Sequence, residues 1–149
     1  MNKKQLFSYI IMLIGITMIL LGIRWLIVEE PWMLDEVANV ERLEMTFDEL
    51  FAPEINSTLP GYLRQIYRFF GFWVVLIGFF ITCFSSPKIT DSSTIRKRLL
   101  FCLGIMMILG TILGHSLIPS SHFIYLIWIM NVLYIFSIYN HIGMNNEKS

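Results

Sequence analysis

The sequence has little charge, little cysteine and no excess of either sign. Only 15% of its 149 residues are charged and 56% are apolar, whereas a soluble domain averages about 25% charged. Eleven basic and eleven acidic residues leave no net positive charge, which excludes a typical nucleic-acid binder. The apolar content excludes disorder, and two cysteines are too few for a disulfide scaffold. A small integral membrane protein remains.

Signatures of catalysis are also missing. The sequence contains no phosphate-binding glycine loop, nucleophile elbow, His-Glu-x-x-His or haem-attachment motif. Cys83 and Cys102 form no Cys-x-x-Cys pair, so we expect no disulfide. We expect no catalytic residue, no cofactor and no metal site, and a non-enzymatic role is favoured over an enzymatic one.

Four apolar stretches are long enough to cross a bilayer, whose core of about 30 Å needs about 20 helical residues. They cover residues 6–28, 66–84, 99–118 and 123–142. Each must satisfy its own backbone hydrogen bonds in hydrocarbon, so each is expected to be helical. The prediction is a single all-α membrane domain over residues 1–149, a four-helix transmembrane bundle. Residues 29–65 and 85–98 then lie on opposite sides of the membrane.

Basic residues predict the orientation of this bundle. The side that holds both termini collects seven of them: Lys3, Lys4, Lys88, Arg96, Lys97, Arg98 and Lys148. The other side holds Arg42 and Arg64, with Arg24 and Arg68 just inside the ends of the first two spans. Because Lys and Arg gather in cytoplasmic loops, we expect cytoplasmic termini, a cytoplasmic loop at 85–98 and an extracytoplasmic segment at 29–65.

The extracytoplasmic segment is strongly acidic, with nine acids against two arginines. Its apolar residues recur in steps of three and four, at Val37, Val40, Leu43, Phe47, Leu50 and Phe51. Thr46 and Glu49 match a capping box, and Pro53 should end the helix that follows. We expect one or two amphipathic helices that form a short acidic cap. Three roles stay open for it: a cover for the bundle, a docking face for a partner protein, or a divalent-cation site.

Four ionisable residues are expected in the outer leaflet, beneath the acidic segment: Arg24, Arg68 and His115 at a matching depth, and His122 just beyond. Ionisable groups inside spans are costly and so suggest a function. One hypothesis is that Arg24 or Arg68 pairs with an acid of the cap and holds it in place. The other is that all four line a positively charged pocket for a lipid headgroup, a quinone or a small anion.

Polar and small residues within the spans predict helix packing. Thr17 and Asn131 lie near span centres, where a hydrogen bond between helices contributes about 0.6–2 kcal/mol. Glycines that would let backbones approach closely stand at Gly15, Gly22, Gly71, Gly78, Gly110 and Gly114. The first and third spans also share Gly-Ile-x-Met-Ile-Leu, at 15–20 and 104–109, which suggests a duplicated hairpin.

The stretch from Tyr67 to Tyr139 resembles small bacterial four-span proteins of DoxX-like architecture, most of them of unknown function. The likeness is carried by Arg68-Phe69-Phe70-Gly71-Phe72-Trp73, Gly78, Arg96-Lys97-Arg98, Gly110, Gly114 and Ser120-Ser121-His122-Phe123. This sequence departs from the pattern in two places, since His115 and Asn131 stand where an arginine and an acid would be expected. The resemblance implies a bacterial plasma membrane, and some such proteins are similar to subunits of quinone-linked oxidoreductases.

These observations leave three functional hypotheses. The first is a non-enzymatic accessory, regulatory or interaction protein, with another membrane protein or a second copy as partner. The second is a binder of a lipid, quinone or small anion in an outer-leaflet pocket. The third is a small oligomeric transporter. All three place the chain in a lipid bilayer and none involves nucleic acid.

Overall fold

A computed structural model describes residues 2–146 of the chain, with side chains through Met144. Four helices dominate it: α1 (Lys3–Ile27), α4 (Leu59–Phe84), α5 (Ser93–Leu117) and α6 (Phe123–Asn146). Each is long and apolar enough to cross a membrane, so the chain is a small integral membrane protein with an all-α fold. Lys148, one of the seven basic residues that predict the orientation, lies outside the described residues.

Local capping chemistry explains where these helices begin. The Asn2 side chain accepts from the Gln5 backbone, and the Gln5 side chain accepts in return from Asn2, a complete capping box for α1. Ser92 caps α5, so this helix begins before residue 99. Pro60 stands in the first turn of α4, where its missing N–H costs nothing, and α4 therefore begins before residue 66.

The segment between α1 and α4 folds into four short helical pieces, called the cap below. They are η1 (Pro31–Asp35), α2 (Glu36–Leu43), α3 (Phe47–Phe51) and η2 (Glu54–Asn56). The expected capping box is confirmed, since the Glu49 backbone donates to the Thr46 hydroxyl and the Glu49 carboxylate accepts from Thr46. The rings of Trp32, Phe47 and Phe51 pack together as the core of the cap.

The single apolar face expected along the cap is only partly correct. Glu44 adopts a left-handed conformation, with φ of 56°, which ends α2 and turns the chain before α3 begins. Phe47 is buried as expected, but Val37 and Leu43 remain exposed. The turn explains the difference, because residues on its two sides no longer share one helical face.

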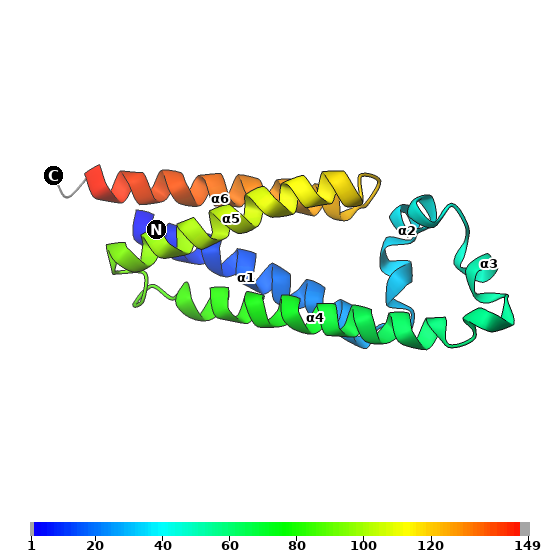
Figure 1. Cartoon of the computed structure of the whole chain (residues 1–149). Helices are drawn as coiled ribbons and strands as arrows, with labels where there is room; N and C mark the ends of the chain where they lie inside the picture. The colour runs from blue at the N-terminus through cyan, green and yellow to red at the C-terminus, as the bar shows by residue number, and fades with distance from the viewer. Residues whose placement is uncertain (1, 147–149) are drawn as a thin grey trace.

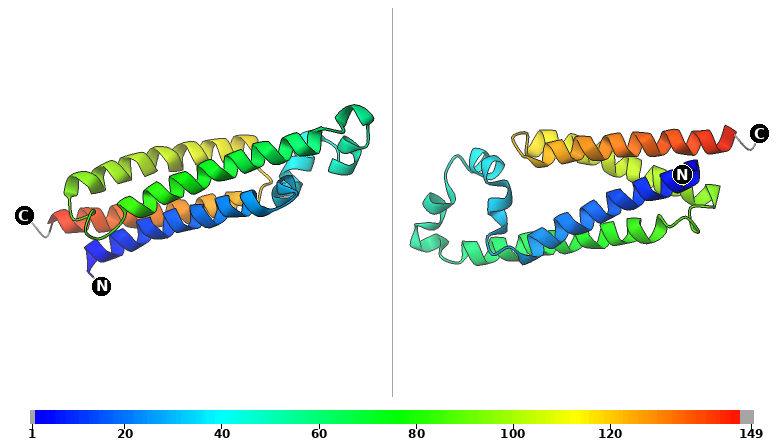
Figure 2. Two further views of the ribbon diagram at one scale, coloured as in Figure 1. Left: turned by 90° about the horizontal axis from the view of Figure 1, so that it is seen from below. Right: turned by 180° about the vertical axis from the view of Figure 1, so that it is seen from behind.

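The four long helices pack as two pairs. α1 packs along α4, α5 packs along α6, and α1 joins the pairs by packing on α6. The loop 85–92 joins α4 to α5, yet these two helices hardly touch. Figures 1 and 2 show the pairs drawing apart toward the end that carries the cap, whereas they converge near the two termini. We call these the cap end and the termini end.

The positions of the buried side chains reflect this divergence of the two helix pairs. Most of the buried apolar core lies toward the termini end, where Phe7, Ile11, Leu100 and Met144 belong to one cluster. At the cap end, the Trp25 ring bridges the pairs, with its centroid 4.9 Å from that of Phe70 and 5.0 Å from that of Phe123. Large aromatic rings therefore span the wider separation.

The cap connects the two pairs across their open end, as Figure 1 shows. Arg42 of α2 donates from Nε to the Leu117 carbonyl (2.6 Å) and from Nη2 to the Ser116 carbonyl (2.8 Å), at the end of α5. Ser120, in the α5–α6 turn, donates to the Glu41 carboxylate. On the other pair, Arg64 of α4 donates to the Glu29 carbonyl at 2.7 Å. The cap thus acts as a strap between the pairs.

Candidate functional site

The four ionisable residues expected to form an outer pocket lie on the surface of the bundle. Arg24, Arg68, His115 and His122 are all exposed, and none of them lines the cavities described below. His115 stays on its own helix pair, with Nδ1 2.9 Å from the Thr111 carbonyl and its ring against Trp128. A similar depth, if expected from the sequence alone, does not bring side chains on different helix faces together.

The hypothesis that Arg24 or Arg68 holds the cap in place is wrong. Within residues 2–144, neither arginine forms an ion pair or a hydrogen bond. Arg42 takes this role instead, and it binds backbone carbonyls rather than acids. The physical reason is that the last carbonyls of α5 have no partner within the helix and accept readily from a nearby guanidinium.

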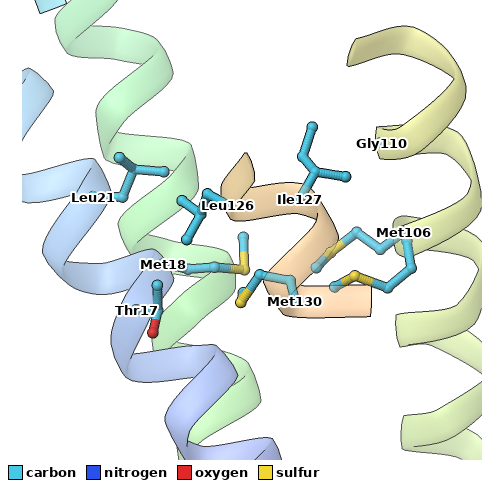
Figure 3. A pocket seen from close by; sticks show the side chains of 9 residues that line it. Thr17, Met18, Leu21, Met106, Gly110, Leu126, Ile127 and Met130 are labelled. Atoms are coloured by element: carbon cyan, nitrogen blue, oxygen red, sulfur yellow. The ribbon is translucent and has the colours of Figure 1, made fainter. Parts of the chain in front are cut away.

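A cavity of about 150 Å³ lies between α1, α5 and α6, near the middle of the bundle. Figure 3 shows its lining, which α4 does not join: Thr17, Met18, Leu21, Met106, Met107, Gly110, Leu126, Ile127 and Met130. The lining is almost entirely apolar and four of its nine residues are methionines. The Thr17 hydroxyl donates to the Leu13 carbonyl of its own helix, so it is already satisfied. The cavity therefore suits an apolar group.

The repeated motif lines this cavity from two sides. Its third and fourth positions are Thr17 and Met18 in α1, and Met106 and Met107 in α5, and all four belong to the lining. The residue after the motif also lines the cavity in both copies, as Leu21 and Gly110. Figure 3 places the two copies on either side of α6. The cavity thus lies where α1 and α5 each pack on α6.

Asn131 fastens α6 to α5 beside the cavity. Its amide Nδ2 donates to the Thr111 hydroxyl at 2.9 Å and to the Ile127 carbonyl of its own helix at 3.0 Å. Thr111 donates in turn to the Met107 carbonyl at 2.7 Å. Thr111 was not singled out from the sequence. Its position next to Gly110, in the span that precedes the one containing Asn131, could have indicated a polar partner for Asn131.

Four of the six expected packing glycines form a reciprocal contact between α1 and α4. A Cβ on Gly22 would lie 2.6 Å from the Gly71 carbonyl oxygen, and one on Gly71 would lie 2.8 Å from that of Gly22. Gly15 and Gly78 meet in the same way, with a Gly78 Cβ 2.7 Å from the Gly15 carbonyl oxygen. Neither pair leaves room for a side chain, and the shared spacing of seven residues matches the two antiparallel helices.

The remaining glycines behave differently. A Cβ on Gly114 would meet the side chain of Ile127 at 2.7 Å. Gly110 does not serve the close packing expected of it, because a Cβ there would meet nothing within 4 Å and the residue faces the cavity. Gly104, which the sequence had not marked as a packing glycine, makes room for Tyr134, whose hydroxyl would lie 2.5 Å from an added Cβ. That hydroxyl donates to the Leu100 carbonyl at 2.9 Å.

A buried polar cluster at the termini end was missed by sequence reasoning. Arg96 is only 2% exposed, and its Nη1 donates to the carbonyls of Thr90 (2.7 Å) and Asp91 (2.9 Å). Its Nε donates to His141 Nδ1 at 3.2 Å, so that ring nitrogen carries no proton. A buried guanidinium is costly unless it is hydrogen-bonded. Arg96 therefore ties the loop 85–92 to α6.

Further contacts tie α1 to the same loop. The hydroxyls of Ser8 and Thr90 are hydrogen-bonded, and Lys4 forms an ion pair with Asp91 at 2.5 Å. One sequence signal could have revealed the cluster. Ser137, Asn140 and His141 recur at helical spacing on a single face of α6, and all three are buried.

The acids of the cap face water and show no metal-binding geometry. Among the described residues, no three His, Cys, Asp or Glu side chains gather closely enough to hold a metal ion. Hydrogen bonds from the Thr46 backbone and hydroxyl hold the pKa of Glu49 below its ordinary value. Asp35 differs from the other acids because it is buried, and its Oδ1 has no hydrogen-bond partner within the described residues.

Comparison of the chain with protein-family models, curated proteins and solved structures gave no match. The DoxX-like resemblance therefore has no support beyond the residues that carry it.

Proposed function

We propose that this chain is a non-enzymatic membrane protein that holds part of a long apolar chain, acyl or isoprenoid, in the cavity between α1, α5 and α6. The observation that carries the proposal is the cavity itself, with its apolar, methionine-rich lining. Unbranched methionine side chains adapt to ligands of irregular shape. The absence of an unsatisfied polar group among the lining side chains argues against a headgroup or a small ion at this place.

The size of the cavity defines what it can hold. Its volume of about 150 Å³ is similar to that of an apolar cavity that can take up a hydrocarbon the size of benzene. It therefore accepts a segment of a chain and not a whole lipid. Moving that segment out of the bilayer gains no hydrophobic free energy, because lipid tails are as apolar as the lining. The gain comes from packing contacts that an empty cavity lacks.

Photo-crosslinking tests this proposal. The protein in nanodiscs is exposed to a fatty acid with a diazirine in mid-chain, and crosslinked peptides are mapped by mass spectrometry. We expect saturable crosslinking at Met18, Met106 or Met130, above the level at lipid-facing Phe79 and Phe80. Oleic acid and a long-chain quinone, added as separate competitors, distinguish an acyl ligand from an isoprenoid one.

Gly110 provides the matched variant. Gly110→Leu places a side chain in open space that faces the cavity, so it should abolish crosslinking at the methionines without disturbing the packing. Leu109→Met, on an exposed surface of the same helix, should leave it unchanged. Equal crosslinking at the lining and at the lipid-facing rings, or no effect of Gly110→Leu, would refute the proposal.

A second candidate function is association with another membrane protein, and the surface of α4 favours it. Among the long helices α4 packs only on α1, which leaves Phe69, Phe72 and Trp73 exposed beside Arg68. Arginine and aromatic residues are enriched at protein interfaces. Purification in mild detergent should recover a stoichiometric partner or a dimer, and Arg68→Ala should weaken it. A clean monomer would count against this candidate.

We also propose an orientation for the chain in the plasma membrane. Basic residues gather at the termini end and acids at the cap, which supports cytoplasmic termini and an extracytoplasmic cap. Ile55 is 90% exposed at the tip of the cap, so Ile55→Cys can be labelled from outside intact cells in a chain whose native cysteines are replaced by alanine. Lys88→Cys, in the opposite loop, should react only after the membrane is opened. The reverse result would invert the orientation.

A further inference from the structure

A second apolar hollow, of about 380 Å³, lies at the termini end where α4 and α5 hardly touch. We call it the α4–α5 groove. It is lined by Phe84 at the end of α4 and by Ile95, Arg98, Leu99 and Cys102 at the start of α5. It shares no residue with the cavity between α1, α5 and α6, and it does not depend on the proposed function.

The lining has one polar member, Arg98. Arg98 lies in the second turn of α5, whereas Cys102 lies one helical turn deeper, about 6 Å along the axis. Arg98 is exposed and makes no hydrogen bond or ion pair with any described residue. Its surroundings are basic, since besides Arg98 itself the sequence over residues 1–10 and 85–98 holds five Lys and Arg against Asp91 alone. Asp91 is already engaged by Lys4.

We propose that the α4–α5 groove binds an anionic phospholipid, with one acyl chain against Phe84, Leu99 and Cys102 and the phosphate on the guanidinium of Arg98. Arginine suits this role because its planar fork binds phosphate through two parallel hydrogen bonds. The apolar lining receives the chain, and the basic surroundings favour a headgroup with net negative charge over a zwitterionic one. A free phosphate compound lacks the chain that the rest of the lining would contact.

The two native cysteines provide a local readout without any mutation. Both are exposed free thiols, but Cys102 lines the groove and Cys83 does not. In dodecyl maltoside, added dioleoyl phosphatidylglycerol should slow the reaction of Cys102 with a small maleimide several-fold relative to Cys83. Dioleoyl phosphatidylcholine and water-soluble glycerol phosphate should each leave the ratio of the two rates unchanged.

Matched variants test the headgroup contact. Native mass spectrometry of the intact chain should show phosphatidylglycerol retained over phosphatidylcholine. Arg98→Gln should reduce that retention about tenfold, which is the change in affinity expected when a hydrogen bond to a charged group is lost. Lys97→Gln removes the same charge from the neighbouring exposed residue, outside the groove, and should change retention less than twofold.

Three results would overturn the inference. If Arg98→Gln and Lys97→Gln lost phosphatidylglycerol retention equally, the lipid would respond to the general charge of this region and not to a defined site. Equal retention of both lipids would show a groove that does not select the headgroup. Protection of Cys83 as strong as that of Cys102, or protection by glycerol phosphate, would place the ligand elsewhere.

Discussion

Replacing Gly78 by alanine tests the close contact between α1 and α4. A Cβ at this position would lie 2.7 Å from the Gly15 carbonyl oxygen and 2.9 Å from both the Ile19 amide nitrogen and the Met18 Cβ. Ordinary van der Waals contact begins near 3.4 Å, so α1 would have to move away by about half an ångström or more. Such overpacking costs about 1–3 kcal/mol in a well-packed interior.

Gly110→Ala is the matched control, because it also replaces a glycine inside a long helix but meets nothing within 4 Å. Both variants gain the same helix propensity, about 1 kcal/mol, so this contribution cancels in their difference. We expect Gly78→Ala to have a free energy of unfolding about 1–3 kcal/mol below that of Gly110→Ala.

The assay is unfolding in mixed micelles with increasing dodecyl sulfate, followed by tryptophan fluorescence and far-ultraviolet circular dichroism. Gly71→Ala, at the second reciprocal contact, should behave like Gly78→Ala, because its Cβ would lie 2.8 Å from the Gly22 carbonyl oxygen. If Gly78→Ala and Gly110→Ala proved equally stable, the two backbones would not be in contact there and the reasoning would be refuted.

Three further predictions concern polar contacts. Asn131→Leu should lower the free energy of unfolding by about 0.6–2 kcal/mol, measured in the same micelles, because it removes the hydrogen bond from α6 to α5. Arg96→Met should lower the free energy of unfolding by about 1–3 kcal/mol, since buried carbonyl acceptors lose their donor. Lys97→Met, at the exposed neighbouring position, should change the free energy of unfolding by less than about 0.5 kcal/mol. Hydrogen bonds lower the pKa of Glu49 in the folded protein. The Glu49 carboxylate therefore stabilises α3 fully at pH values above its pKa in the unfolded chain, and this stabilisation is lost as the pH falls through its pKa in the folded protein. Thr46→Ala should therefore raise the Glu49 midpoint in a carbon-detected NMR titration, and an unchanged midpoint would contradict this.

The helices themselves could be predicted because their causes are local. Apolar stretches of sufficient length must be helical in hydrocarbon; four were expected, and the described residues contain four. The capping box of Thr46 and Glu49 was predictable for the same reason, since both partners lie within one turn. The span predicted at 66–84 lies within α4, which begins earlier because Pro60 suits a first turn even where the sequence is polar.

The candidate sites were harder to predict. Arg96 was counted as one more basic loop residue, yet it is buried against His141, 45 positions away. The sequence predicts a similar depth for Arg24 and Arg68, but which face each side chain takes depends on how the helices pack. The repeated motif was visible, whereas its arrangement around a cavity was not.

By itself, then, the sequence determined four membrane-length helices, an acidic cap with its Thr46 capping box, and two pairs of glycines spaced seven apart. These follow from hydropathy and from contacts within a few residues along the chain. Three features depend on how the helices pack: the helix pairs diverge, Arg42 ties the cap to α5, and Gly110 faces a cavity while Gly78 meets a backbone. The physical reason is that apolar residues on every face of a span carry no record of which face meets protein and which meets lipid.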